Sequence, residues 1–236
     1  MTEHTGDAYD VIAEKYAATV DTKPWNAYYE RPATLSLLPP LAGTRVLDVG
    51  CGSGWYAEYL VEHGAIVTSF DFNQKMVELT QTRLGNRARV LQADLALPLS
   101  FAQDAEYDLA VCPLVMHYLR DWLPPLKELN RALKPGGVLV FSTHHPFNDW
   151  KLFNRDDYFA TELLHDEWED IGKVSFYRRP LTDMTDAIRS AGFWIEQILE
   201  PRPTEDFWRV NPEAYQRLMT NPWFLVIRAK KQCGSD

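Results

Sequence analysis

The residues best suited to chemistry stand in one short segment, where an apolar run ends in three alternating glycines. Residues 46–54 read VLDVGCGSG, and a second apolar run, 66–70, ends at Asp71. Because glycine has no Cβ atom, such a turn lets the backbone approach a ligand closely, and an acid about 20 residues further on can accept hydrogen bonds from ribose hydroxyls. The segment therefore predicts a nucleoside-binding site made of strand, glycine turn, helix, strand and acid.

The glycine turn by itself leaves the nucleoside open. Residues 52–57, GSGWYA, match the dinucleotide fingerprint G-x-G-x-x-G/A, so an NAD-dependent oxidoreductase is one interpretation. A glycine-rich turn without any ligand is another, but the spacing of both strands and the acid favours a binding site.

Three histidines are candidates for a general base, because the unperturbed pKa of histidine lies near neutral pH. His117 follows the apolar run 107–111, and the pair His144 and His145 ends the run 137–143. Since successive residues of a strand face opposite sides, we expect at most one of the pair to point into a site. The three cysteines are widely spaced and match neither a disulfide framework nor a zinc pattern, so we expect no metal.

These residues need a scaffold, and apolar runs alternating with helical stretches supply one. The predicted strands are 45–49, 66–70, 89–92, 107–111, 137–143, 194–199 and 223–229. The predicted helices are 55–63, 74–84, 124–133 and 182–191. Strands separated by helices imply right-handed crossovers and an α/β fold with a parallel sheet, whose carboxyl ends would gather the glycine turn, the acid and the histidines.

The rest of the chain divides around this scaffold into parts of one predicted domain, 1–236. A helical leader is expected over 1–40, a ligand-binding core over 41–145, an insertion over 146–180, and a terminal helix with strands over 181–230. The insertion is rich in aromatic residues and acids and shows no clear period. We interpret it as a lid over the carboxyl ends of the strands, where open α/β sheets bind ligands, with a loop packed on the sheet edge as the alternative.

Composition limits the partners and the compartment. Acids outnumber bases 33 to 24, the formal net charge is −9, and no cluster of Lys and Arg is present to track phosphates, which argues against nucleic acid. The chain has no signal-peptide pattern and no apolar run long enough to span a bilayer, so we expect a cytoplasmic protein without membrane contact. We read Arg178 and Arg179 as a solvated basic pair, or as a site for an acidic acceptor.

Taken in order, the motifs resemble those of the class I S-adenosylmethionine (SAM)-dependent methyltransferases, especially the bacterial type 11 group that acts on small molecules. The resemblance is carried by 46–54 (VLDVGCGSG), Asp71, 92–95 (QADL), 107–110 (YDLA), His117 with Tyr118, and 133–137 (LKPGG). These motifs cover about residues 40–145, and the elements predicted in 181–230 fit the same fold.

The resemblance implies a Rossmann-like, seven-stranded, doubly wound sheet, mostly parallel with the last strand antiparallel, with SAM as cofactor and S-adenosylhomocysteine (SAH) as product. The cofactor-binding residues that it implies are Tyr16, Arg31, Asp48, Gly50, Cys51, Gly52, Gly54, Asp71, Phe72, Asp94 and Leu95.

The family's pattern also implies a role for each of these residues. The glycine turn would approach the methionine part of SAM, with Asp48 nearby. Asp71 would bind the ribose hydroxyls, and Asp94 the adenine amine, with Leu95 and Phe72 beside the ring. In the leader, Tyr9 and Tyr16 resemble a motif that closes over SAM, although packing on the core explains these tyrosines equally well. Arg31 could pair with the methionine carboxylate.

We favour methyl transfer to a small, partly apolar acceptor at oxygen or carbon, by a monomer or homodimer. Amide- and adenine-N-methyltransferases resemble one another in a proline-proline-aromatic motif, which is missing at 112–115 (CPLV). A tRNA-modifying methyltransferase of the same fold and a non-catalytic SAM-binding protein remain alternatives. An NAD-dependent oxidoreductase loses support because it has no use for an acid at 94 or for residues 133–137.

Overall fold

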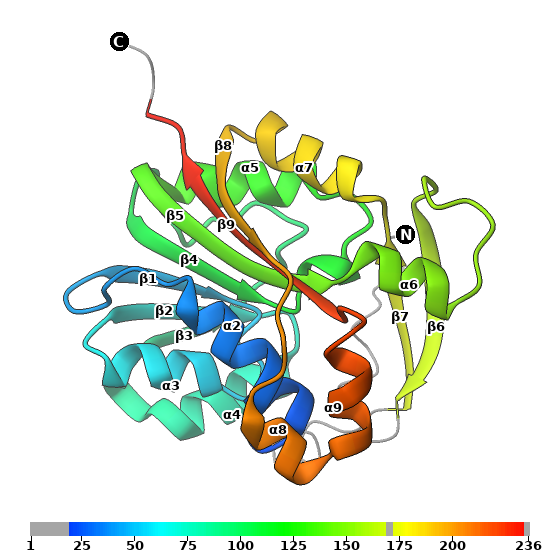
Figure 1. Ribbon diagram of the computed structural model, residues 1–236. Helices are drawn as coiled ribbons and strands as arrows, with labels where there is room; N and C mark the ends of the chain where they lie inside the picture. Colours follow the sequence, from blue (N-terminus) through cyan, green and yellow to red (C-terminus); the bar gives the residue numbers. More distant parts are fainter. Residues whose placement is uncertain (1–18, 169–171, 234–236) are drawn as a thin grey trace.

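The computed structural model describes residues 19–168 and 172–233, and Figure 1 shows a twisted sheet with helices on both sides. Seven strands form the sheet in the order β3-β2-β1-β4-β5-β9-β8. Their bounds are Arg45–Val49 (β1), Ile66–Asp71 (β2), Arg89–Gln92 (β3), Tyr107–Pro113 (β4), Leu133–His144 (β5), Phe193–Leu199 (β8) and Phe224–Lys231 (β9). β9 runs antiparallel to both of its neighbours, β5 and β8, whereas the other neighbouring pairs are parallel, so the predicted fold class is confirmed.

Helices cover the two faces of this sheet in two separate layers (Figure 1). The helices on one face are α2 (Arg31–Ser36), α3 (Trp55–Glu62) and α4 (Gln74–Leu84); those on the other are α5 (Leu123–Ala132) and α7 (Leu181–Ser190). Alternate residues of each strand face the two layers: in β1, Val46 packs with α2 and α3, whereas Leu47 packs with α5. This alternation is what a sheet buried on both faces requires.

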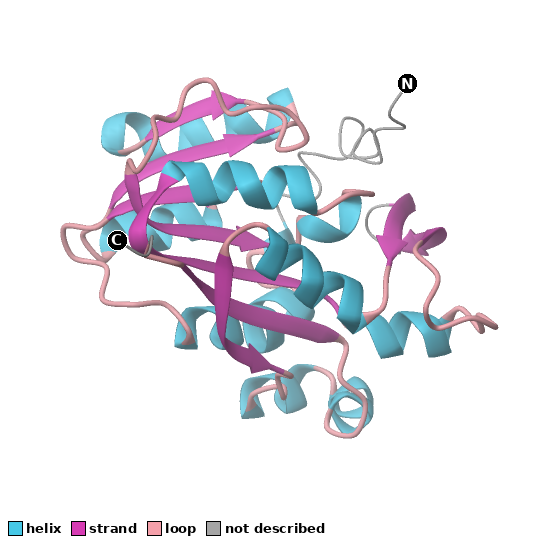
Figure 2. Ribbon diagram, turned by 90° about the horizontal axis from the view of Figure 1, so that it is seen from above, coloured by secondary structure: helices cyan, strands magenta, loops and turns pink. Residues whose placement is uncertain are grey.

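The insertion after β5 forms regular elements that the sequence did not predict. It contains α6 (Pro146–Leu152) and an antiparallel hairpin of β6 (Glu162–Trp168) and β7 (Gly172–Arg178). Figure 2 shows this hairpin as a separate pair of strands beyond one end of the main sheet. Among the described residues, Leu164, Val174 and Phe176 form its buried core, and these few apolar positions give a signal of period two that is too sparse to recognise.

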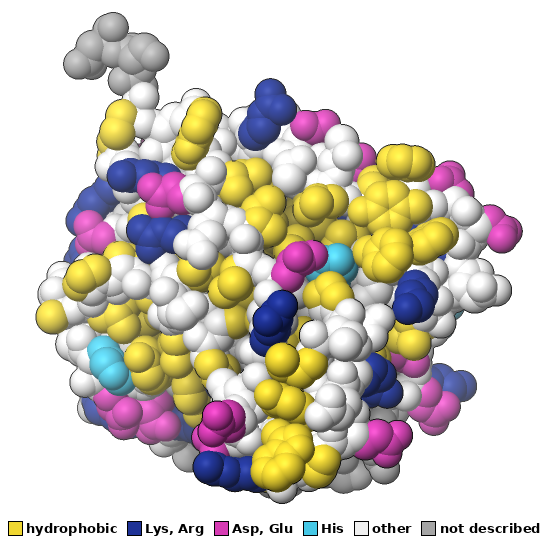
Figure 3. Space-filling view, viewed as in Figure 1, with side chains coloured by type: hydrophobic (Ala, Val, Ile, Leu, Met, Phe, Trp, Pro, Cys, Tyr) yellow, Lys and Arg dark blue, Asp and Glu magenta, His cyan; other side chains and the backbone are white. Residues whose placement is uncertain are grey.

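The insertion also presents apolar side chains to the outside. Phe147, Leu152 and Phe159 are exposed, and Figure 3 shows hydrophobic side chains gathered over this part of the molecule. Trp150 and Tyr158 join Phe147 and Phe159 in a chain of edge and tilted ring contacts with centroid separations of 5.3 to 6.1 Å.

The leader and the connection between β8 and β9 depart from the predicted elements. In the leader, 1–18 lie outside the described residues, and after a turn at 21–22 the chain forms η1 (Asn26–Glu30) and α2. The connection carries two short helices, α8 (Glu205–Val210) and α9 (Pro212–Leu218). The shortest elements are η2 (Gly85–Arg87) and η3 (Met116–Tyr118). In the described part of the chain, no helix is long and apolar enough to cross a membrane.

Both interpretations of the basic pair after the hairpin are wrong, because Arg178 and Arg179 are buried. Arg178 pairs with Glu162 and donates to the backbone carbonyls of Asp157 and Tyr158. Arg179 lies 4.6 Å from the ring centroid of Trp122 and donates to the carbonyls of 119 and 120. Arg178 therefore holds the insertion together, and Arg179 fastens the end of the hairpin to the core, so neither guanidinium is available to an acceptor.

One glycine of the turn is fixed by a close approach that no other residue type would permit. A Cβ atom on Gly50, whose φ is +68°, would lie 2.3 Å from Cγ2 of Val115. Gly43 has a similar φ of +77°, but a Cβ atom there would meet nothing within 4 Å.

We therefore expect Gly50→Ala to cost more stability than Gly43→Ala in urea unfolding. Gly43→Ala carries only the left-handed backbone strain, about 1–2 kcal/mol, whereas Gly50→Ala adds an overlap worth about 1–3 kcal/mol. Adding Val115→Ala to Gly50→Ala should recover part of that second contribution. Equal losses for the two glycine variants would contradict the close approach.

Candidate functional site

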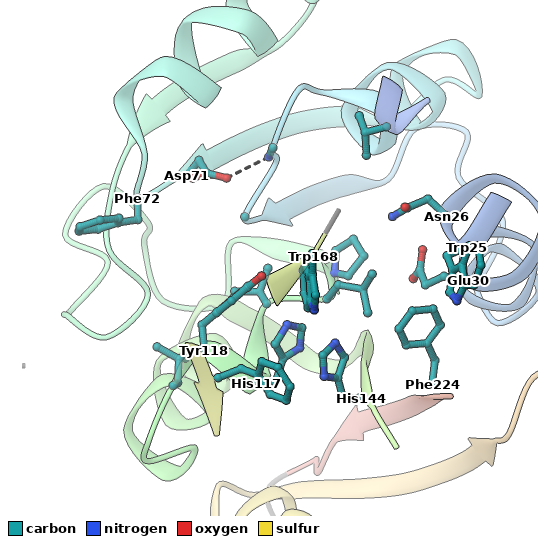
Figure 4. Close-up of a pocket in the computed structure, with 18 of the residues that line it drawn as sticks. Trp25, Asn26, Glu30, Asp71, Phe72, His117, Tyr118, His144, Trp168 and Phe224 are labelled. Atoms are coloured by element: carbon teal, nitrogen blue, oxygen red, sulfur yellow. Dashed lines mark hydrogen bonds between the residues drawn. The ribbon is translucent and has the colours of Figure 1, made fainter. Parts of the chain in front are cut away.

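A cavity of about 1370 Å³ opens at the carboxyl ends of the parallel strands. Its walls come from the leader, the glycine turn, the ends of β2, β4 and β5, the insertion and the start of β9 (Figure 4). Single-ligand pockets usually measure about 300–1,000 Å³, so the cavity has room for two small molecules side by side.

The glycine turn forms one wall and is held by Asp71. Gly50, Cys51 and Gly52 line the cavity, and a Cβ atom on Gly52 would meet nothing within 4 Å, so the backbone here is open to a ligand. The backbone N–H of Gly52 donates to Oδ2 of Asp71 over 2.9 Å, as Figure 4 shows. Gly54 lies behind the turn, where it begins α3 and packs on Thr80.

The residues that the resemblance assigns to adenine also meet at this wall. Phe72, Asp94 and Leu95 all line the cavity. Oδ1 of Asp94 accepts a hydrogen bond from the backbone N–H of Ala96 over 2.8 Å, which fixes the carboxylate. Their gathering fits the nucleoside end of SAM.

Asp48 lies behind this wall, fully buried and outside the cavity lining. Its Oδ2 accepts a hydrogen bond from the Ser69 hydroxyl over 3.0 Å. Burial, assisted by the charge of Asp71, raises the pKa of Asp48 to about 7. Its Oδ1 is buried without a hydrogen-bond partner among the described residues.

Of the two leader residues implied for SAM, Arg31 is placed and Tyr16 lies outside the described residues, as does Tyr9. Arg31 lines the cavity, and its guanidinium donates to the carbonyls of Val20 (3.0 Å) and Asp21 (2.7 Å). The same group lies 4.1 Å from the ring centroid of Trp55, which begins α3.

The three histidines separate into a stacked pair and one that turns away. The rings of His117 and His144 are stacked with centroids 4.1 Å apart, and both line the cavity (Figure 4). Nε2 of His145 instead lies 2.8 Å from Oε1 of Glu200, outside the cavity lining. Burial lowers the pKa of His144 to about 4 and that of His117 well below its usual range, so both rings are neutral at neutral pH.

Aromatic side chains surround the stacked pair. Phe176 of β7 meets the His144 ring edge-on with centroids 4.5 Å apart, and Trp168 of β6 lies 5.9 Å from it. Tyr118 and Phe224 complete this chamber, which Figure 4 shows at some distance from Asp71 and Phe72. The cavity thus has two ends. We call the end at Asp71, Phe72 and Asp94 the nucleoside end, and the end around the stacked histidines the aromatic end.

Two buried acids of the cavity were not predicted. Glu30 of η1 accepts hydrogen bonds from the hydroxyls of Thr34 (2.7 Å), Ser142 (2.6 Å) and Tyr56 (2.9 Å), and its burial raises the pKa of the carboxyl. Asp149 of α6 lies in the insertion beside His144. Neither residue belongs to a motif. Their place in the site becomes visible only in the folded structure, where both carboxyl groups are buried in the cavity wall.

Comparisons with known proteins find similarity in both sequence and fold. A family model described as a methyltransferase domain matches residues 47–141. A SAM-dependent methyltransferase from Mesorhizobium loti superposes with a TM-score of 0.76 and 28% identity over 90% of this chain and 100% of that one. An uncharacterized protein from Haemophilus influenzae is 26% identical over 227 residues, which cover 87% of this chain and 88% of its own.

A malonyl-[acyl-carrier protein] O-methyltransferase from Pseudescherichia vulneris is 32% identical over 135 residues, or 56% of this chain and 53% of that enzyme. The chain thus spans about half the length of this relative. The domain match over residues 47–141 and the solved relatives are consistent with a class I SAM-dependent methyltransferase of the type 11 group. It is a methyltransferase whose cofactor is SAM.

The position of Asp48 leads to a prediction on stability. Because its pKa in the folded protein is raised from 3.8 to about 7, the stability that its protonated form contributes is lost as pH rises through that range. The difference corresponds to ~4 kcal/mol as an upper bound. We expect Asp48→Asn, which stays neutral, to raise the melting temperature relative to wild type at pH 8, and to raise it by clearly less at pH 5, where only part of that range has been crossed.

Asp156→Asn, at an exposed position of the insertion, serves as the control and should shift neither melting temperature. A gain from Asp48→Asn that is the same at both pH values would show that Asp48 is ionised in the folded protein throughout.

Proposed function

We propose that this methyltransferase transfers a methyl group to a hydroxyl oxygen of a small, flat, largely apolar acceptor. The observation that carries the proposal is the stacked, neutral pair His117 and His144 inside the aromatic end of the cavity. The match to an enzyme named as an O-methyltransferase supports oxygen as the methylated atom.

In this proposal the nucleoside end holds SAM with the residues named from the sequence. Gly50, Cys51 and Gly52 would run along the methionine part, with Arg31 a candidate partner for its carboxylate. Asp71 would accept from the ribose hydroxyls, and Asp94 from the adenine amine, with Phe72 and Leu95 on the ring. All of these side chains and backbone groups line the cavity.

The aromatic end would hold the acceptor. Rings of Trp168, Phe176 and Phe224 favour a flat apolar molecule, because aromatic surfaces gain most from stacked and edge contacts. These residues come from the insertion and from β9, so the insertion acts as the lid that completes the acceptor site. Arg178 and Arg179 are occupied elsewhere, which argues against a strongly acidic acceptor at this point.

The ring nitrogens decide which histidine can take the acceptor's proton. Both nitrogens of His117 and Nδ1 of His144 are buried with no hydrogen-bond partner among the described residues. Nε2 of His144 is the one ring nitrogen of the pair outside this set, and His144 lines the cavity, so we take Nε2 as the nitrogen that faces the acceptor. A neutral imidazole with that lone pair free can act as a general base.

SAM supplies a methyl group that is already activated on a sulfonium, so the chain has to align the acceptor and remove its proton. The hydroxyl proton passes to Nε2 of His144, the oxygen forms the new C–O bond, and the electron pair of the broken C–S bond stays on sulfur, which leaves SAH. Alignment can contribute up to about 7–11 kcal/mol to such a reaction.

The role of Asp71 can be tested by calorimetric titration with SAH. We expect Asp71→Ala to weaken binding by about ten- to a few hundred-fold, because hydrogen bonds to a charged acceptor contribute about 1.5–3 kcal/mol each. Asp108→Asn, in an ion pair with Lys134 outside the cavity, should bind SAH like wild type. Unchanged affinity in Asp71→Ala would remove Asp71 from the site.

The acceptor class can be tested with methyl-tritiated SAM and a panel of simple phenols, catechols, aliphatic alcohols, aromatic amines and bulk tRNA. We expect label in phenol or catechol methyl ethers. With the active phenol, His144→Gln should lower kcat by about 10²–10⁴-fold without changing SAH affinity, whereas His145→Gln should retain activity. Transfer only to amines, alcohols or tRNA, or full turnover by His144→Gln, would refute the proposal.

A further inference from the structure

A carboxyl group stands next to the enclosed nitrogen of His144. Oδ2 of Asp149 lies 3.7 Å from Nδ1 of His144, and both side chains are more than nine-tenths buried. His144 is the last residue of β5, and Asp149 lies in the first turn of α6. The backbone N–H of Asp149 donates to the carbonyl of His145 over 3.0 Å. The sharp passage from strand to helix therefore fixes the two groups against each other.

The two groups also share the same wall of the cavity, which a purely structural pair need not do. Asp149 and His144 both line the cavity, and Nδ1 of His144 has no other partner among the described residues. Among the described residues, Asp149 is thus the acid whose carboxyl lies within ion-pair distance of Nδ1 of His144, the nitrogen of this ring that is buried without a hydrogen bond.

We propose that Asp149 is the positioning residue for His144, holding the imidazole so that Nδ1 carries its proton toward the carboxylate and Nε2 presents its lone pair to the acceptor. This inference rests on the proposed function in taking His144 as the proton acceptor. The distance of 3.7 Å exceeds the 2.7–3.2 Å of a formed hydrogen bond, but catalytic hydrogen bonds are often long before the ligands bind.

The protonation state of Asp149 decides which tautomer His144 adopts. An ionised carboxylate accepts from Nδ1–H and leaves Nε2 free, whereas a protonated carboxyl donates to Nδ1 and forces the ring proton onto Nε2. Burial raises the pKa of Asp149; the charge of Arg178 on β7 opposes this and that of Asp166 on β6 adds to it. Asp166 also acts on His144, whose other titratable neighbour is the stacked His117.

The tautomer can be observed without an acceptor, so the test is independent of whether the proposed function is right. Two-bond ¹H–¹⁵N correlation spectra of protein labelled with [¹⁵N]histidine distinguish Nδ1–H from Nε2–H. The chain has six histidines, and the signals of His144 are those lost in His144→Gln. We expect His144 of the SAH complex to be the Nδ1–H tautomer at pH 8.5. In a titration upward from pH 5.5 it should either show this tautomer at every pH or change to it once, as Asp149 ionises.

Asp149→Asn and Asp149→Leu should both abolish this preference, since an amide can donate to Nδ1 and leucine can accept nothing. Asp156→Asn, at an exposed position of the same insertion, should give the wild-type spectrum. A wild-type His144 that stays Nε2–H up to pH 8.5, or one whose tautomer survives in both Asp149 variants, would overturn the proposal. In that case Asp149 serves only to balance the buried charge of Arg178.

Once a phenolic acceptor is known, kinetics supply a second readout. Asp149→Asn should lower kcat at least tenfold with unchanged KM for SAM. Where the spectra of the wild type show a change of tautomer, Asp149→Asn should also lose the matching inflection of the pH profile. Loss of melting temperature without loss of kcat in the folded variant would count against the proposal.

Discussion

The hydrogen bond from the backbone N–H of Gly52 to the carboxylate of Asp71 is the constraint on which the nucleoside end of the cavity depends. The other oxygen of the same carboxylate accepts from the backbone N–H of Asn73 over 2.8 Å, and Asn73 in turn begins α4 by accepting from Lys75 and Met76. One side chain at the end of β2 thereby sets both the turn after β1 and the start of the next helix. A carboxylate bonded to two backbone N–H groups is held rigidly, and so is the wall that it supports.

The aromatic end of the cavity is built on a different principle. Its residues come from η3, β5, the insertion and β9, so it forms only when segments about a hundred residues apart have packed together. What determines its chemistry is desolvation, which keeps His117 and His144 neutral and raises the pKa of Asp149. The nucleoside end is thus defined by short-range backbone geometry, and the aromatic end by long-range burial.

This difference explains how much the sequence could predict. Strands β1 and β3 and helix α4 coincide with the predicted ranges, because apolar runs ended by turn residues are local signals. The motif residues Gly50, Asp71 and Asp94 are brought to one cavity as the resemblance implies.

Features that depend on distant partners could not be predicted in the same way. In the sequence, Arg178 and Arg179 look like a surface pair. In the structure Arg178 pairs with Glu162, and Arg179 donates to the carbonyls of 119 and 120. Asp149 can be recognised as a candidate only because it lies beside His144 of the preceding strand and is buried. No local pattern marks such a residue.

Glu30 shows what this dependence means for the molecule as a whole. Its carboxyl accepts from Tyr56 of α3 and from Ser142 of β5, which lies two residues before His144. Breaking these contacts would leave buried polar groups unpaired in two separate layers, at a cost of about 1–3 kcal/mol for each. Local unfolding of the described part of the leader from η1 onward would therefore disturb both the helical layer and the strand that carries His144, and so couples the leader to both ends of the cavity.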